Sequence, residues 1–137
     1  QNLKQKNIRI DAVGMQAHWN LENPSIQEIE SSIIAYANAG VDVMITELDI
    51  SVLPWNEDPY TQGLPDDIDN KLSERYKSIF ALLYKHKDKI SRVTVWGVHD
   101  GQSWLNNHPV QGRTDYPLLF NRNYEAKNCL YAILHIF

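Results

Sequence analysis

The stretch VDVMITELDIS, residues 41–51, decides the fold that the sequence predicts. Its first half is apolar and β-branched, which is typical of a strand buried on both faces. Its second half carries two carboxylates, Glu47 and Asp49, which should point to the same side because side chains alternate along a strand. Two neighbouring acids at the end of a buried strand cost free energy unless they have partners. The pair is therefore a candidate functional site, and the alternative is a strand that has emerged into a solvated loop.

The composition is that of one ordinary globular domain. The chain has 137 residues, 43% of them hydrophobic, and contains no apolar run long enough to span a bilayer. Its net charge of −4 gives no indication of a nucleic-acid surface. The single cysteine, Cys129, cannot form an internal disulfide and lies in an apolar helical pattern, so we expect it in the core. No Cys/His cluster of the metal-binding kind is visible, and we expect no cofactor and no membrane partner.

The order of predicted elements is strand then helix, three times over. A capping box formed by Ser25 and Glu28 begins the first helix, and Gly40 ends it. The predicted strands are 11–17, 41–49 and 90–98, and the predicted helices are 26–39, 70–86 and 125–137. Such units with buried strands predict an α/β fold with parallel strands and right-handed crossovers. A closed eightfold barrel needs roughly 250 residues, so the chain is either a small three-layer domain or part of a barrel.

Two further features bear on this choice. Residues 1–7 read like the tail of a helix and lead directly into a strand, so we expect the chain to begin in mid-domain. The loops 50–69 and 99–123 are too long to be mere connections, and long ordered loops in compact domains are often functional.

Polar and aromatic residues follow all three predicted strands at the same place. Beside the two acids of the second strand, these are Gln16 and His18 after the first strand and Trp96, His99, Asp100 and Trp104 after the third. Parallel strands bring their carboxyl ends to one face, and active sites of βα barrels lie on that face. This convergence favours a functional role for Glu47 and Asp49 over a solvated loop.

Two reaction classes could use these residues. Glu47 could be the nucleophile or stabiliser in glycoside hydrolysis, which also needs a carboxylic proton donor. The indoles of Trp96 and Trp104 suit the stacking of a pyranose ring, and His18 could hold a proton that keeps Glu47 ionised. Alternatively, His18, His99 and one of the acids could bind a divalent metal that activates water, although the sequence has no His-x-His pair.

The remaining aromatic and histidine residues carry less information. Trp55 fits a sugar platform and loop packing equally well. The sequence around His86, His108 and His135 gives them no supporting context, so we interpret them as solvated or packed side chains.

Three motifs resemble one known family. The segments MQAH (15–18), ITELD (45–49) and VWGVHDGQSW (95–104) are similar to the last three strand ends of glycoside hydrolase family 10, the endo-β-1,4-xylanases. GRTDYPLLF (112–120) resembles the segment before that family's final helix. The resemblance implies that residues 1–137 are the C-terminal (βα)3 portion of a (β/α)8 TIM barrel.

The resemblance also implies roles on xylan and xylooligosaccharides. Glu47 would be the nucleophile of a retaining double displacement, and Gln16 would contact the bound sugar. His18 would hydrogen-bond to both Glu47 and Asp49 and fix their orientation. Trp96 and Trp104 would line the subsite for the xylose on the non-reducing side.

One departure from the family pattern concerns the mechanism. The family's acid/base glutamate follows an asparagine on an earlier strand, in the half of the barrel that would precede residue 1. The pair Asn56-Glu57 resembles that acid/base motif, but it lies in a Pro-flanked loop with no strand before it, so we do not expect Glu57 to be the acid. We therefore expect the missing half, in the same parent chain or in a second chain, as a partner. The alternative is a non-catalytic xylan-binding fragment. A polymeric substrate implies a secreted, periplasmic or cell-surface location.

Overall fold

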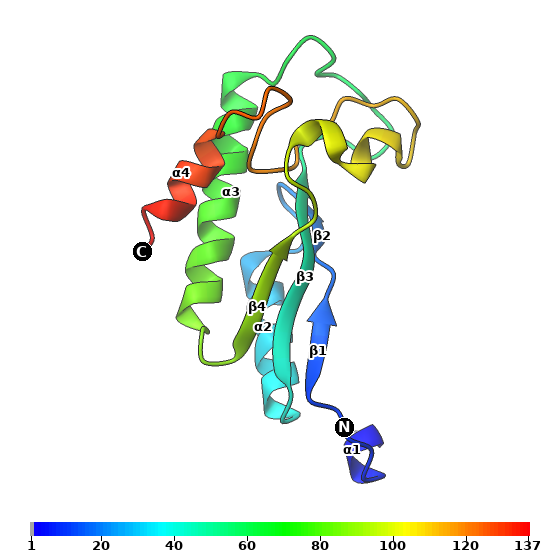
Figure 1. Cartoon of the computed structure of the whole chain (residues 1–137), viewed down its shortest axis with the longest axis vertical. Coiled ribbons are helices and arrows are strands. Elements are labelled where there is room, and N and C mark those ends of the chain that lie inside the picture. The colour runs from blue at the N-terminus through cyan, green and yellow to red at the C-terminus, as the bar shows by residue number, and fades with distance from the viewer. Residues whose placement is uncertain (1) are drawn as a thin grey trace.

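The computed structural model describes residues 2–137 and shows a parallel sheet with helices packed on one face (Figure 1). The strands are β1 (Ala12–Met15), β2 (His18–Asn20), β3 (Asp42–Ser51) and β4 (Ile90–Val95). The helices are α1 (Asn2–Gln5), α2 (Ile26–Asn38), α3 (Asp66–Lys85) and α4 (Asn128–Leu134), with short 3-10 turns η1 (Asp100–Gln102) and η2 (Trp104–Asn107). Strand β3 is central: β1 and β2 pair with it on one side and β4 on the other, all parallel. The predicted α/β class and parallel order are confirmed.

The first predicted strand is two strands in the structure. Ala17 has a φ of +68°, which is outside the extended region. The pairing with β3 is therefore interrupted after Met15 and resumes at His18. The prediction that His18 follows the end of the strand is therefore wrong, since His18 opens β2. Because of this break, strand alternation does not determine whether the side chains of Gln16 and His18 lie on the same side of the sheet.

The helix ends follow local chemistry. Ser25 and Glu28 form both hydrogen bonds of the predicted capping box, and Gly40 follows the helix with a φ of +76°, so both predictions are confirmed. Helix α3 begins four residues earlier than predicted. Pro65 stands at its N-cap, and three acids in the first turn suit the positive end of the helix dipole.

The last helix is shorter than predicted. Residues before it are held in a bridge between Phe120 and Ala126, and Tyr124 has a φ of +65°, so the helix cannot start at residue 125. Cys129 is buried in α4 as predicted, and burial raises the pKa of its thiol to about 11. In the part of the chain that the structure describes, no helix is both long and apolar enough to cross a bilayer.

The hydrophobic core lies between the sheet and the helices. Val43 and Ile45 of β3 meet Ile33 of α2 and Tyr76 of α3, all with no exposed surface. The predicted burial of the strands on both faces is wrong within this chain, because the helices cover only one face. The register places Gly14, Met44 and Arg92 side by side on the other face, where they are exposed or half-buried.

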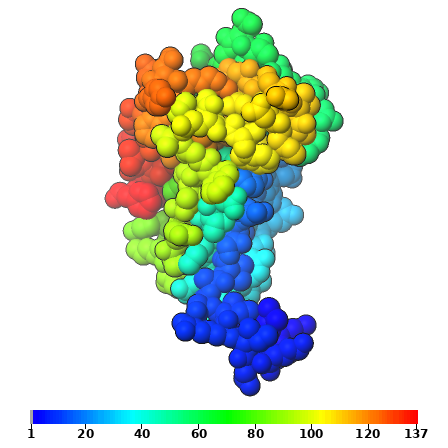
Figure 2. Space-filling model, turned by 45° about the vertical axis from the view of Figure 1, so that its right-hand side comes forward, coloured from blue at the N-terminus to red at the C-terminus, as the bar shows by residue number. Residues whose placement is uncertain are grey.

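The carboxyl ends of the strands share one end of the molecule with the long loops. Figures 1 and 2 show the segment after β3 and the segment after β4 gathered at this end, while α1 lies at the opposite end. The convergence predicted from the order of the elements is therefore realised in space.

Candidate functional site

The end of β3 brings two carboxylates against a single imidazole. His18 Nδ1 lies 3.0 Å from each carboxylate oxygen of Asp49, and His18 Nε2 lies 3.3 Å from Oε2 of Glu47. The register sets this up, because His18 of β2 is directly opposite Asp49 of β3. Both acids reach the same ring, which confirms that they share one side of the strand.

The two contacts of His18 limit how protons can be placed on its two ring nitrogens. If Nδ1 donates a hydrogen bond to Asp49, a hydrogen bond between Nε2 and Glu47 needs one further proton, on either partner. Either an imidazolium donates to a Glu47 carboxylate, or a neutral ring accepts from a protonated Glu47.

Asp49 has a further donor that the sequence does not reveal. The indole Nε1 of Trp104 donates to Asp49 Oδ2 at 2.8 Å, and the Trp104 ring stands edge-to-face with His18 at a centroid distance of 5.0 Å. Asp49 is completely buried, and this burial raises the pKa of its carboxyl, while the hydrogen bonds from Trp104 and His18 oppose the rise. Asp49 is therefore held in one orientation by its donors.

A second buried carboxylate anchors the strand end that carries these acids. Asp115 accepts hydrogen bonds from Ser51 Oγ at 2.6 Å and from the backbone N–H of Val52 at 3.1 Å. Burial raises the pKa of Asp115, and these hydrogen bonds act against the rise. The loop before the last helix thus fixes the point at which β3 leaves the sheet.

Two residues with no predicted role support the aromatic side of the site. The ring of His108 lies between Trp104 and Trp55, at centroid distances of 4.9 and 5.6 Å. Arg113 is buried and donates at 3.0 Å to the backbone carbonyls of His108 and Pro54. It ties together the loops after β3 and β4. Pro54 is 59 residues away from Arg113, so no local pattern could have indicated the contact between these two loops.

Glu47 contacts His18, and the other five predicted site residues fall into two groups. His18, Asp49 and Trp104 border a cavity of about 270 Å³ at the carboxyl end of the sheet. Gln16 is exposed and Trp96 is 46% exposed, and within residues 2–137 no hydrogen bond joins either side chain to the His18 network.

His99 and Asp100, which follow β4, make contacts that stabilise the surrounding loops. His99 Nδ1 accepts a hydrogen bond from the backbone N–H of Gly101, and its ring packs on Tyr124 at 4.3 Å. Asp100 is completely buried and forms an ion pair with Lys127 at 3.0 Å. Over the described residues 2–137, no group of three or more His, Cys, Asp or Glu side chains is placed to hold a metal ion.

Known proteins are similar to this chain in both sequence and fold. A family model described as glycosyl hydrolase family 10 matches residues 1–136. The chain belongs to glycosyl hydrolase family 10. Its three βα units are accordingly a portion of that family's (β/α)8 barrel, as the resemblance of the motifs implied.

Relatives in family 10 match nearly the whole chain. The endo-1,4-β-xylanase A of Xylanibacter ruminicola is 42% identical over 100% of the chain, and the endo-1,4-β-xylanase of Geobacillus stearothermophilus is 39% identical over 99%. The solved structure of a family 10 endoxylanase from a sugarcane soil metagenome is 49% identical over 98% of the chain, with a TM-score of 0.96. The solved structure of a mutant protein in complex with xylotriose is similar with a TM-score of 0.91, at 33% identity over 97% of the chain. The chain spans 41–42% of the length of these four proteins.

Proposed function

We propose that this chain supplies the nucleophile half of the active site of a retaining endo-β-1,4-xylanase. The observation that carries the proposal is the contact of His18 with both Glu47 and Asp49 at the carboxyl end of β3, in a chain of family 10. The xylanases among its relatives support xylan and xylooligosaccharides as the substrates.

In this mechanism the Glu47 carboxylate attacks the anomeric carbon of a xylose unit. The glycosidic bond breaks, and its oxygen takes a proton from a carboxylic acid on the remainder of the barrel, about 5–5.5 Å from Glu47 in a retaining enzyme. Water, deprotonated by that same second residue, then hydrolyses the glycosyl ester and frees Glu47. The proposal makes that remainder, in the same polypeptide or a second one, an obligatory partner.

The other site residues position Glu47 or hold the sugar. His18 and Asp49 orient the nucleophile, because one imidazole bonds to both carboxylates. We assign sugar contacts to Gln16, Trp96 and Trp104, whose polar groups and partly exposed indoles suit a pyranose. Since polymeric xylan does not enter a cell, we also propose that the complete protein acts outside the cytoplasm, which activity assays of the culture supernatant and cell fractions would test.

The decisive test replaces Glu47 by Ala in the complete barrel. We expect a loss of at least about 10³-fold in kcat, because members of a catalytic unit are individually essential, and an unchanged circular dichroism spectrum. Glu57→Ala is the control and should have little effect, since Glu57 lies in the loop after β3, outside the carboxylate–imidazole network.

A small anion separates the nucleophile from an acid. With an aryl β-xylobioside, azide should restore turnover in Glu47→Ala and give the α-glycosyl azide, because azide replaces the missing carboxylate in a single displacement. A β-configured azide product would assign Glu47 to proton transfer and contradict the proposal. Xylooligosaccharide binding without any product release by the unmodified barrel would favour the non-catalytic alternative.

A further inference from the structure

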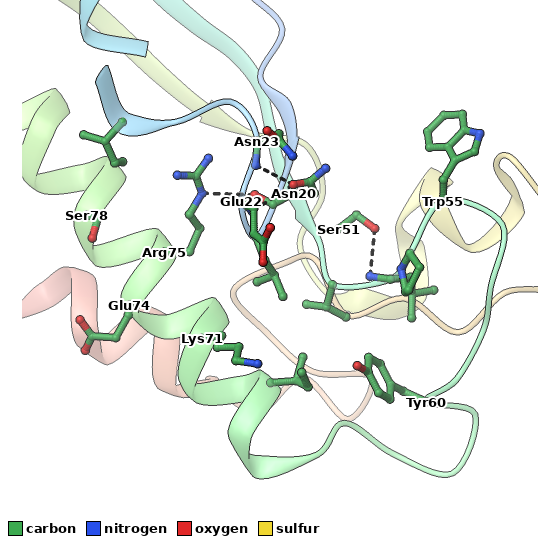
Figure 3. Close-up of a pocket in the computed structure, with 16 residues that line it drawn as sticks. Asn20, Glu22, Asn23, Ser51, Trp55, Tyr60, Lys71, Glu74, Arg75 and Ser78 are labelled. Carbon is green, nitrogen blue, oxygen red and sulfur yellow. Dashed lines mark hydrogen bonds between the residues drawn. The ribbon is translucent and has the colours of Figure 1, made fainter. Parts of the chain in front are cut away.

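A second and larger hollow lies on the outer side of the loop that follows β3. Its volume is about 700 Å³, within the range of roughly 300–1,000 Å³ that is typical of small-molecule sites. Figure 3 shows Lys71 pointing from α3 toward this loop, Trp55 and Tyr60 on the loop itself, and Asn20 at the end of β2 with Asn23 on the segment after it. We call this hollow the α3 groove.

The walls of the α3 groove come from consecutive elements of this one chain. They are the segment after β2, the end of β3 with its loop, and α3. Arg75 of α3 is 8% exposed and donates to the backbone carbonyls of Asn20 and Pro24, so it fastens the helix to the segment after β2. The groove is therefore formed before any ligand arrives, which lowers the cost of binding.

Trp55 stands on the ridge between the α3 groove and the cavity beside His18. It borders both spaces, as do Asn20, Ser51 and Leu53. Its indole is 66% exposed and extends outward from the loop (Figure 3). The hydrogen bond from Arg113 to the carbonyl of Pro54, directly before Trp55, holds the backbone at this point. An exposed indole on a fastened loop is a preformed surface for stacking.

The charges of the α3 groove are balanced. Two acids, Glu22 and Glu74, and two bases, Lys71 and Arg75, line it. A strongly anionic or cationic ligand would find as much repulsion as attraction there. An uncharged chain with apolar CH faces and many hydroxyl groups fits both the indole and the polar lining.

We propose that Trp55 and the α3 groove bind a distal stretch of the xylan chain, beyond the sugar units held at Glu47. This inference rests on the proposed xylanase function. It assigns to Trp55 the task of stacking on a sugar ring where the chain leaves the cavity beside His18. The groove then receives the following units through the Lys71 side chain and the Asn20 amide.

The test uses the complete barrel that contains this chain and compares Trp55→Ala, Trp55→Phe, Lys71→Ala and Tyr131→Ala. Tyr131 is 52% exposed on α4 and serves as the control for loss of an exposed aromatic side chain. We expect Trp55→Ala to lower kcat/KM on polymeric xylan at least about fivefold more than on an aryl β-xylobioside, as truncation of an aromatic anchor costs more than ~1 kcal/mol. Trp55→Phe should restore part of the loss, and Lys71→Ala should give a smaller loss of the same kind.

A binding measurement removes any dependence on turnover. In a Glu47→Ala background, electrophoresis through gels containing soluble xylan should show weaker retardation for Trp55→Ala than for Tyr131→Ala. Equal retardation of these two variants, or equal loss of activity on the long and short substrates, would overturn the distal site. Failure of the unmodified barrel to hydrolyse xylan at all would instead overturn the proposed function, so the two failures are distinguishable.

Discussion

Asp49 shows how a buried charge becomes a positioning device. It has no exposed surface, yet both of its oxygens have donors, from His18 and from Trp104. A buried carboxylate with such donors cannot rotate without losing hydrogen bonds that water does not replace. The orientation of His18 follows from that of Asp49, and the orientation of Glu47 follows from that of His18.

Removing only the indole donor tests this at the scale of one atom. Trp104→Phe keeps an aromatic ring but loses the N–H that donates to Asp49 at 2.8 Å. Hydrogen bonds to charged groups contribute about 1.5–3 kcal/mol, so we expect a drop in kcat of roughly tenfold or more if that energy orients Glu47. Because the Trp104 hydrogen bond lowers the pKa of Asp49, its loss should raise that pKa and move the acid limb of the pH–activity profile to higher pH.

The matched control is Trp55→Phe, which also exchanges an indole for a phenyl ring but at a side chain that is 66% exposed. Its acid limb should stay in place. An acid limb that is identical in Trp104→Phe and in the unmodified protein would contradict the positioning role of the indole.

At the scale of elements, the end of β4 depends on one glycine. Gly97 has a φ of +141°, which side chains rarely adopt, and a Cβ on it would lie 2.7 Å from Cδ1 of Leu118. The chain turns there between Trp96 and His99. The turn therefore determines the position of Trp96 at the end of β4.

Gly97→Ala should lower the free energy of unfolding through both backbone strain and overpacking, each of which costs about 1–3 kcal/mol. Gly63→Ala is the control, because Gly63 has a similar φ of +131° but nothing within 4 Å of the added methyl group. Urea denaturation of the two variants separates the two costs. Equal destabilisation of both would show that the contact with Leu118 contributes nothing.

At the scale of the whole molecule, one buried ion pair connects the loop after β4 to the last helix. Lys127 Nζ lies 3.0 and 3.2 Å from the oxygens of Asp100 and donates to the carbonyl of Tyr116 at 2.7 Å. Both side chains are almost completely buried. Lys127→Met should cost about 3–5 kcal/mol of stability, because it leaves a buried carboxylate without its cation.

Lys77→Met removes an exposed pair with Glu74 and should change stability by less than about 1 kcal/mol. The pH dependence gives a second readout. Burial raises the pKa of Asp100 above its ordinary value of 3.8, and Lys127 opposes that rise. The folded state of Lys127→Met should thus bind a proton more readily than the unfolded chain. Its stability should recover as the pH falls through the raised pKa toward 3.8, and a flat difference between pH 7 and pH 4 would contradict this.

The uncovered edges and face of the sheet indicate how the chain should behave without the rest of the barrel. Strands β1 and β4 have free edges, and the face that carries Met44 and Arg92 has no covering layer among the described residues. A barrel closes such edges. We expect the purified 137-residue chain to release almost no reducing sugar from xylan. Addition of the complementary half of a family 10 barrel should raise the rate, and a turnover near that of whole xylanases without it would contradict the proposal.

Local chemistry accounts for what the sequence determined by itself. The capping box at Ser25, the glycine at position 40 and the β-branched run of β3 each act within a few residues, so the βα order and the placement of Glu47 and Asp49 could be predicted. The same local reasoning missed the start of α3, because the acids after Pro65 suit either a loop or the first turn of a helix.

Only the tertiary structure decided how the site is held. The sequence did not reveal the break in the strand at Ala17. It also did not reveal the hydrogen bond from Trp104 to Asp49 or the one from Arg113 to Pro54, because both depend on tertiary packing. The indole of Trp104 and the carboxylate of Asp49 are 55 residues apart, and their hydrogen bond exists because parallel strands bring both loops to one end of the sheet. The sequence determined which groups could do chemistry, and the packing of the sheet against its helices decided which of them touch.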